Sequence, residues 1–241
     1  MTILKLQEVQ YAYPDGNTAV AGVSFTLQQG QSVGLVGANG AGKSTLLMMV
    51  PGALMPTSGT IEVEGVTLTK ATAAQIRRSV GLVFQDADDQ LFTTTVYEDV
   101  AFGPRNMGKK EPEVEKAVCA ALEQAGIAHL ADRAPYRLSG GERKLAAIAS
   151  VLSMEPELLI MDEPSASLDP KARRGIIRLL HNLPMAKLIA SHDLDLVWEA
   201  CSRVIVLKDG RVEADGDAKE LLADQKLMER CGLELPLRLQ K

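Results

Sequence analysis

The chain has 241 residues, 46% of them hydrophobic and 24% charged, which is enough for one large α/β domain with its own core. The formal net charge of −5 argues against a general affinity for nucleic-acid backbones, because such proteins usually present a basic face. The three cysteines, Cys119, Cys201 and Cys231, lack metal-ligand spacing and indicate reduced thiols rather than a disulfide framework.

Strand signals come first along the chain. Residues 3–31 read as short strands separated by turns at 14–16 and 29–30, and a second strand-rich patch covers about 58–69. The N-terminus enters this pattern without a signal-peptide signature, and no apolar run reaches the roughly 18–20 residues needed to cross a bilayer. If the protein works at a membrane, we expect another chain to supply the membrane-spanning part.

A glycine-rich loop follows the apolar run 32–36 and precedes the apolar run 46–49. It begins at Gly37 and has the form G-x-x-x-x-G-K-[ST], in which backbone N–H groups surround a phosphate chain. We expect Lys43 to reach the β- and γ-phosphates and the Ser44 hydroxyl to hold Mg²⁺. The pattern predicts that the chain binds a nucleoside triphosphate through Gly37, Asn39, Gly40, Ala41, Gly42, Lys43, Ser44 and Thr45.

Helix and strand signals alternate through the rest of the chain. Residues from about 86 to 153 are predicted to be mostly helical, with Pro112 opening one apolar-periodic run and Ser139 another. From Leu158 onward, helices alternate with short apolar strands, at 158–161, 187–190 and 204–207. This alternation predicts an α/β fold with a parallel sheet covered on both faces. The segment after Gln225 is amphipathic but interrupted by a proline, and it suits either a dimer contact or a surface cap.

Two acids, Asp162 and Glu163, close the apolar strand at 158–161. A buried parallel strand presents its last residues at the carboxyl edge of the sheet, where the phosphate loop also lies. Asp162 is therefore expected to complete the Mg²⁺ shell opposite Ser44. Glu163 is expected to face the γ-phosphate and to orient or deprotonate the attacking water.

A serine-capped helix begins at the segment Leu138-Ser139-Gly140-Gly141-Glu142, whose N–H groups and hydroxyl suit a phosphate. At this segment the chain resembles the ATP-binding cassette (ABC) family, whose signature is LSGGQ. The resemblance covers about residues 3–225 and includes, in family order, the loop 37–45, the signature 138–142, the acid strand 158–163 and His192.

The resemblance implies a P-loop NTPase core with a RecA-like parallel sheet, an antiparallel β subdomain and an inserted helical signature subdomain at about 86–153. It divides the chain into a single ABC ATPase domain, residues 1–225, and a C-terminal tail, residues 226–241, to which no role is assigned.

The resemblance also implies roles for single residues. Tyr13 matches the aromatic residue that stacks on adenine, with Tyr11 as the less favoured candidate. Gln85 matches the glutamine that touches Mg²⁺ and senses the transporter, and His192 matches the switch histidine at the γ-phosphate. The catalytic residues would then be Glu163, His192, Lys43 and Gln85, and Mg²⁺, bound together with the substrate ATP, would be held by Ser44, Gln85 and Asp162.

In the family, two subunits enclose ATP, so that one chain contributes halves of two different sites. ATP held by the phosphate loop of one subunit would be completed in trans by five residues of the other: Ser139, Gly140, Gly141, Glu142 and, from the loop joining the two sites, Asp169. ATP would close this dimer and hydrolysis would open it.

Three departures from the family pattern occur. Glu142 stands where glutamine is commonest, and we expect this change to be tolerated. Leu145 stands where arginine often follows the signature, and we expect weaker contacts within the helical subdomain. The order Ala166-Ser167 differs from the usual Ser-Ala, and we expect an altered contact between the two sites. None of these changes removes a catalytic group, so we expect a competent ATPase.

The segment 84–104, with its run FQDADDQLF, resembles the energy-coupling factor importers of vitamins, cobalt and nickel, although Ala87 replaces a proline and Tyr97 a glutamate. The resemblance implies a peripheral subunit at the cytoplasmic face of the cell membrane. Its partners would be a transmembrane coupling subunit, a substrate-binding membrane subunit, and a second copy or a second ABC ATPase, with no nucleic acid. The cargo, a metal ion or a vitamin, and the choice between homodimer and heterodimer stay open.

Two other functional classes remain as alternatives. One is a non-transport ABC ATPase acting on nucleic acid or ribosomes. Chromosome-type members insert a long coiled coil between Lys43 and the signature, whereas Ser139 follows Lys43 here after only 96 residues. Translation-type members usually have two cassettes per chain, and this chain has one. The other is a nucleotide-binding regulator without turnover, which the presence of both Glu163 and His192 disfavours.

Overall fold

The computed structural model describes residues 1–240. Its N-terminal part forms an antiparallel sheet of four strands, in spatial order β2 (Thr18–Gln28), β1 (Thr2–Ala12), β4 (Ser58–Val63) and β5 (Val66–Thr67). In β1, Leu4 and Leu6 are buried while Lys5 between them is only half-buried, as expected for a strand with one face on a core. The turns predicted at 14–16 and 29–30 both follow strands, and the predicted antiparallel β subdomain is confirmed.

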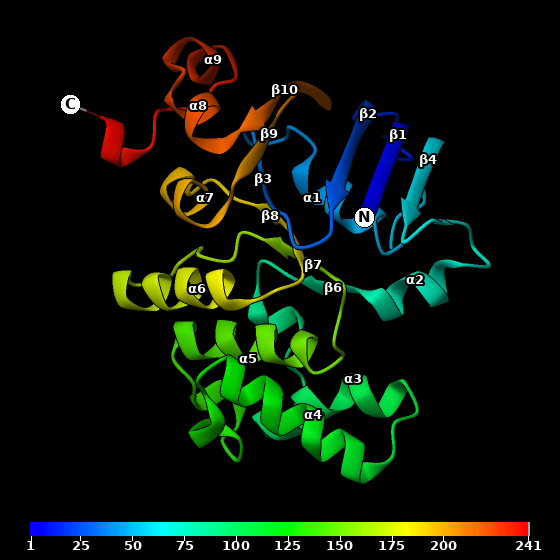
Figure 1. Cartoon of the computed structure of the whole chain (residues 1–241), viewed down its shortest axis with the longest axis vertical. Helices are drawn as coiled ribbons and strands as arrows, with labels where there is room; N and C mark the ends of the chain where they lie inside the picture. Colours follow the sequence, from blue (N-terminus) through cyan, green and yellow to red (C-terminus); the bar gives the residue numbers. More distant parts are fainter. Residues whose placement is uncertain (241) are drawn as a thin grey trace.

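A second sheet forms the centre of the molecule (Figure 1). Its six strands lie in the order β10 (Arg211–Asp217), β9 (Arg203–Lys208), β3 (Ser32–Val36), β8 (Ala186–Ala190), β7 (Leu158–Asp162) and β6 (Val80–Val83). All neighbours pair in parallel except β10, which pairs antiparallel with β9. Every residue of β7 and β8 is buried, and apart from Asp162 and Lys187 all of them are apolar, as expected for central strands covered on both faces. The predicted α/β fold with a parallel sheet is confirmed.

Three helices group together on one side of this sheet (Figure 1): α3 (Val96–Asn106), α4 (Glu111–Gln124) and α5 (Gly140–Leu152). They are accompanied by single 3-10 turns, at η1 (Ala87–Asp89), η2 (Ala128–Leu130) and η3 (Pro135–Arg137). Pro112 lies in the first turn of α4, and Ser139 caps α5. All three helices lie within the range 86–153, where the sequence predicts helix.

The other helices connect or cover the strands: α1 (Lys43–Met49), α2 (Ala73–Ser79), α6 (Pro170–Asn182), α7 (Leu194–Ala200), α8 (Ala218–Ala223), α9 (Gln225–Arg230) and the 3-10 turn η4 (Leu237–Leu239). Within residues 1–240, none of the helices combines the length and the apolar composition that crossing a membrane requires.

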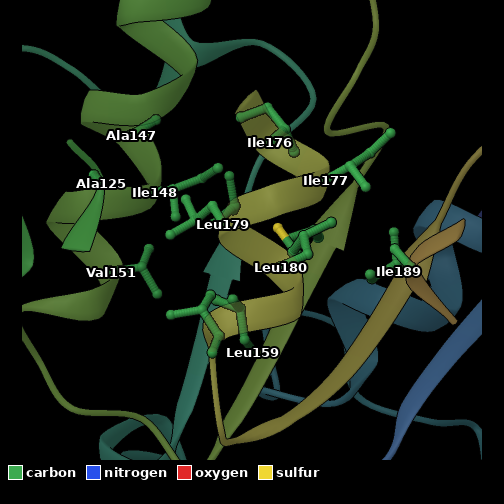
Figure 2. Close-up of a cluster of buried hydrophobic side chains, with 14 of the residues drawn as sticks. Ala125, Ala147, Ile148, Val151, Leu159, Ile176, Ile177, Leu179, Leu180 and Ile189 are labelled. Atoms are coloured by element: carbon green, nitrogen blue, oxygen red, sulfur yellow. The ribbon is translucent and has the colours of Figure 1, made fainter. Parts of the chain in front are cut away.

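Helix α6 joins the helical group to the central sheet. Its buried side chains lie between Ile148 of α5 and Ile189 of β8 (Figure 2). Ile176 and Leu180 of α6 are fully buried in this cluster. A displacement of α6 would therefore disturb the packing on both sides, because protein interiors are closely packed.

The last described residues pack onto the domain rather than extending from it. Leu227 and Met228 of α9 belong to the same hydrophobic cluster as α6, so the buried core continues beyond residue 225. Arg238 then bonds to Asp195 and Glu199 of α7. The boundary at residue 225 and the role of the tail stay predictions.

Candidate functional site

The glycine-rich loop connects β3 to α1 and depends on residues without side chains. Gly42 has φ of 98°, and a Cβ there would lie 2.2 Å from the carbonyl oxygen of Ala19. A Cβ on Gly37 would lie 2.4 Å from the carbonyl oxygen of Leu207. Glycine at these positions lets the loop pack against neighbouring backbone while its own backbone borders an open cleft.

Lys43 is the first residue of α1, directly after this loop, and only 7% of its surface is exposed. Its Nζ donates to the carbonyl oxygens of Gly37, at 2.8 Å, and Ala38, at 3.2 Å. Burial lowers the pKa of Lys43, although the charges of Glu163 and Asp162 oppose the shift. An anionic ligand at the loop would offset this desolvation, because it would be a third negatively charged neighbour of the ammonium group.

A cleft of about 690 Å³ opens over the loop. Its lining brings together residues that are distant in the sequence: Tyr13, Asn17, Thr18, Ala19, Asn39, Gly40, Ala41, Gly42, Lys43, Ser44, Thr45, Gln85, Glu163, Ser165, Ala166, His192 and Asp193. The cleft thus unites most of the predicted nucleotide-binding residues with all four of the predicted catalytic ones.

At the end of β7, two buried carboxylates border this region. Asp162 is 9% exposed and its Oδ1 has no hydrogen-bond partner among residues 1–240. It lines an adjoining hollow of about 550 Å³ together with Ser44 and Gln85. A buried carboxylate oxygen without a partner, beside a hydroxyl and an amide oxygen, fits the all-oxygen ligand preference of Mg²⁺.

Glu163 is 8% exposed and adopts the left-handed backbone conformation, with φ of 46°. Its Oε2 accepts hydrogen bonds from His192 N, at 3.0 Å, and Ser191 Oγ, at 3.3 Å. Its Oε1 lies 3.3 Å from His192 Nε2 but has no described partner in hydrogen-bond geometry. One carboxylate oxygen is thus held by two hydrogen bonds, whereas the other is buried without a hydrogen-bond partner among residues 1–240.

His192 follows β8 and connects this carboxylate to the loop. Its Nε2 lies 3.3 Å from Lys43 Nζ, and its side chain is 45% exposed. The next residue, Asp193, caps α7 and is bonded to Arg173 of α6. Burial alone would raise the pKa of Asp193, but the hydrogen bonds from Arg173 and Leu196 N outweigh this effect and lower it. The same bond raises the pKa of Arg173.

The predicted aromatic partner of the base stands at the edge of the cleft. Tyr13 is 37% exposed, and its hydroxyl lies 2.9 Å from Thr45 Oγ1. The ring of Tyr11 packs against it edge-on, with centroids 5.0 Å apart. Tyr13, and not Tyr11, is among the residues that line the cleft.

The signature segment lies apart from this cleft. Of the described residues that line the cleft, none comes from 138–142, and only Gly140 borders the adjoining hollow. Ser139 Oγ donates to Glu142 Oε2 at 2.8 Å, and Glu142 N donates back to Ser139 Oγ at 3.3 Å. Hydrogen bonds from the Ser139 backbone and hydroxyl lower the pKa of Glu142. The signature is therefore an ordered helix start that lies outside the cleft over the chain's own phosphate loop.

Asp169 is also outside the cleft lining and caps α6. Its Oδ1 accepts hydrogen bonds from Lys171 N, at 2.7 Å, and Ala172 N, at 2.9 Å, which lower the pKa of its exposed carboxyl group. A Cβ on Gly141 would lie 2.6 Å from the Cβ of Ala172, so the signature helix and the start of α6 are in close contact.

Sequence reasoning missed Lys144, which is 3% exposed. Its Nζ donates to the carbonyl oxygens of Phe84, at 3.2 Å, and Gln85, at 2.6 Å, and burial lowers its pKa. Leu145, expected to weaken contacts in the helical region, packs partly buried against the core. A lysine two residues after the signature could have drawn attention to this position. Its hydrogen-bond partners, however, could not be predicted from the sequence.

The chain is similar to known proteins in sequence and in fold. Residues 20–166 match the family model described as ABC transporter. The chain is 50% identical to a Geobacter sulfurreducens protein named as an ABC transporter ATP-binding protein, over 99% of this chain and 96% of that protein. It is 43% identical to the energy-coupling factor transporter ATP-binding protein EcfA of Methanothermobacter thermautotrophicus, over 97% and 77%. The structure of cbiO1 from Clostridium perfringens, part of the ABC transporter complex cbiONQ, superposes with a TM-score of 0.85 at 41% identity, covering 95% and 94%.

Proposed function

Because this chain belongs to the ABC transporter family and is an ATP-binding, ATP-hydrolysing subunit, we propose that it powers an importer of the energy-coupling factor type. The observation that supports hydrolysis best is the pair of unpartnered carboxylate oxygens, on Asp162 and Glu163, beside Lys43 and His192. Importer function is supported by the likeness to EcfA and to cbiO1, together with the segment 84–104.

ATP enters the cleft with its phosphates on the loop. Backbone N–H groups of the loop and Lys43 bind the phosphates, and Tyr13 stacks on the base after its hydroxyl leaves Thr45. The direct contributors in the loop are Gly37, Asn39, Gly40, Ala41, Gly42, Lys43, Ser44 and Thr45.

Ser44, Gln85 and Asp162 would hold Mg²⁺ that arrives with ATP, and the ion would neutralise charge on the phosphates. Glu163 Oε1 accepts the proton of the attacking water, while Oε2 stays bonded to His192 N. His192 Nε2, which lies 3.3 Å from Lys43 Nζ, contacts the γ-phosphate.

A second subunit completes the site. Ser139, Gly141 and Asp169 do not line the cleft of their own chain, yet a serine hydroxyl at a glycine-rich helix start suits a phosphate. We place ATP between the phosphate loop of one subunit and the signature of the other, with Gly140, Glu142 and Asp169 also at the shared boundary. The partner is a second copy or a related ABC ATPase.

The membrane partner docks on the segment that follows Gln85. Phe92 and Phe102 form an exposed edge-on pair, with ring centroids 4.9 Å apart and exposures of 65% and 46%. Both lie within 84–104, the segment that resembles the energy-coupling factor group. A coupling helix of a transmembrane subunit would bury these rings and so hold the protein at the cytoplasmic face of the membrane. The transported substrate would be a metal ion such as cobalt or nickel, or a vitamin.

Affinity purification of the tagged chain from detergent-solubilised source membranes tests this proposal. We expect mass spectrometry to identify a small multi-span coupling protein and a substrate-binding membrane subunit. Substituting Phe92→Ala and Phe102→Ala together should abolish the recovery of these membrane subunits while ATP hydrolysis remains. The control Leu237→Ala truncates an apolar side chain that is 75% exposed, and it should change neither the recovery nor the hydrolysis. Recovery of ribosomal or DNA-associated proteins without a membrane partner would overturn the transport proposal.

A further inference from the structure

An ion pair connects α6 to the residue that follows His192. Arg173 Nη2 donates to Asp193 Oδ1 at 2.8 Å, and Arg173 Nε donates to Asp193 Oδ2. Ser165 Oγ donates to the same Oδ2 at 3.1 Å. About three quarters of each charged side chain is covered, since the exposed fractions are 25% and 24%. This two-bond arrangement restricts the position of Asp193 more than a single contact could, because a guanidinium binds a carboxylate with fixed geometry.

Asp193 in turn orders the segment that holds Glu163. Its N–H donates to Ser191 Oγ at 3.0 Å, and the same hydroxyl donates to Glu163 Oε2 at 3.3 Å. His192, between these two residues, donates its N–H to Glu163 Oε2 at 3.0 Å. Hydrogen bonds thus lead from Arg173 to the Asp193 side chain, and from the Asp193 backbone through Ser191 Oγ to the carboxylate beside the cleft.

The other end of the connection is the turn at Asp169. This residue caps α6, and Arg173 lies one helical turn further along the same helix. The bonds from Lys171 N and Ala172 N hold the Asp169 carboxylate to the first turn. Because a helix moves as a rigid element, any displacement of the Asp169 turn along the axis of α6 also displaces the Arg173 guanidinium.

We infer that Arg173 is a positioning residue for ATP hydrolysis. A movement of the turn at Asp169 would move Arg173, and Arg173 would in turn move Asp193, and with it His192 and Glu163. The inference rests on the proposed function, in which the partner subunit contacts Asp169. Closure of the dimer would fix the position of α6. Arg173 would then act through Asp193 to align the Glu163 carboxylate with the attacking water. Hydrolysis would then depend on dimer closure without any direct contact between Arg173 and ATP.

The test compares three variants of the full chain, Arg173→Ala, Arg173→Lys and Arg174→Ala. Arg174 is the exposed neighbour on the same helix and controls for loss of a charge from α6. We expect Arg173→Ala to lower kcat by about 10- to 100-fold, the usual range for misplacing a reacting group, while the Kd for ATP changes less than about twofold. Arg173→Lys retains the positive charge but cannot make the two parallel hydrogen bonds of a guanidinium group. Its kcat should therefore lie between those of the wild type and Arg173→Ala.

A purely structural role would lower the thermal midpoint and the fraction of active protein, but it would leave kcat per active site unchanged. The coupling is checked by Asp193→Ala alone and combined with Arg173→Ala: the double variant should have nearly the kcat of either single variant, because both interrupt one connection. If Arg173→Ala does not fold, Arg173→Lys and Asp193→Asn supply the same comparison.

A kcat of Arg173→Ala within twofold of the Arg174→Ala value, in a protein whose wild type hydrolyses ATP, would overturn this inference alone. Additive effects of the two substitutions would also overturn it. Absence of Mg-ATP hydrolysis in the wild type would instead overturn the proposed function.

Discussion

Replacing Glu163 with glutamine separates ATP binding from ATP hydrolysis. The glutamine oxygen can take the place of Oε2 and accept the bonds from His192 N, at 3.0 Å, and Ser191 Oγ, at 3.3 Å. The NH₂ group then takes the place of Oε1, which has no described hydrogen-bond partner to lose. The change in unfolding free energy should therefore stay within about 1.5 kcal/mol, the difference between a neutral and a charge-assisted pair of bonds.

Turnover should change far more than stability. An amide does not accept the proton of the attacking water, and loss of a general base costs about 10²- to 10⁴-fold, or about 2.7–5.4 kcal/mol of activation free energy. Phosphate release measures kcat, equilibrium titration measures the Kd for ATP, and size-exclusion chromatography with ATP detects a persistent dimer. Glu157→Gln, a substitution at an exposed position just before β7, is the matched control.

The Glu163→Gln variant should bind ATP with nearly the wild-type Kd and elute as an ATP-bound dimer. A kcat within tenfold of the control would refute the role assigned to Glu163. Loss of ATP binding together with turnover would show that the carboxylate acts on nucleotide binding rather than on the water.

Three further predictions concern reactivity, pH and packing. Under native conditions, a thiol reagent should label the exposed Cys119 but neither Cys201 nor Cys231, because both of these are buried, and burial raises the pKa of Cys201 to about 12. Two or three labels detected by intact-mass spectrometry would contradict this prediction. Asp193 has a pKa below its ordinary 3.8 in the folded state, so the stability it contributes is present above about pH 4 and is lost as the pH falls through the folded pKa. Urea unfolding at pH 6 and pH 3 should therefore show that Asp193→Asn loses less unfolding free energy on acidification than the wild type does. Leu180→Ala should lower the unfolding free energy by about 2–5 kcal/mol, measured by the same urea titration, since Leu180 is fully buried; a loss below about 1 kcal/mol would mean that the cluster around α6 collapses to fill the space.

The parts of the molecule that sequence could predict are those determined by adjacent residues. The motif from Gly37 to Thr45 can be recognised from its own spacing, and in the structure it runs from the end of β3 into the first turn of α1, as the pattern indicates. Ser139 caps α5, as a serine before a helical pattern predicts. The short apolar runs at 158–161 and 187–190 form buried parallel strands, because an apolar run of that length with turn signals on both sides suits a sheet covered on two faces.

Contacts between distant segments could not be read from the sequence. Lys144 binds a carbonyl 59 residues away and Arg173 binds a carboxylate 20 residues away, and neither follows from helical periodicity. Strand β10 was also missed, because it lies at the sheet edge and its residues are only exposed or half-buried, so that no apolar run marks it. These features depend on how α5, α6 and the sheet pack together, which is a property of the whole fold.

The central claim, a site shared between two subunits, is tested most directly by mixing two inactive variants. Lys43→Ala removes the cation of the phosphate loop, and Ser139→Arg blocks the signature. In a mixed dimer, the intact loop of one subunit would face the intact signature of the other. After subunit exchange without ATP, an equal mixture should recover about a quarter of the wild-type turnover, because half of the dimers are mixed and each contains one complete site. A mixture no more active than its separate components, with both variants folded and Ser139→Arg still binding ATP, would contradict the shared site.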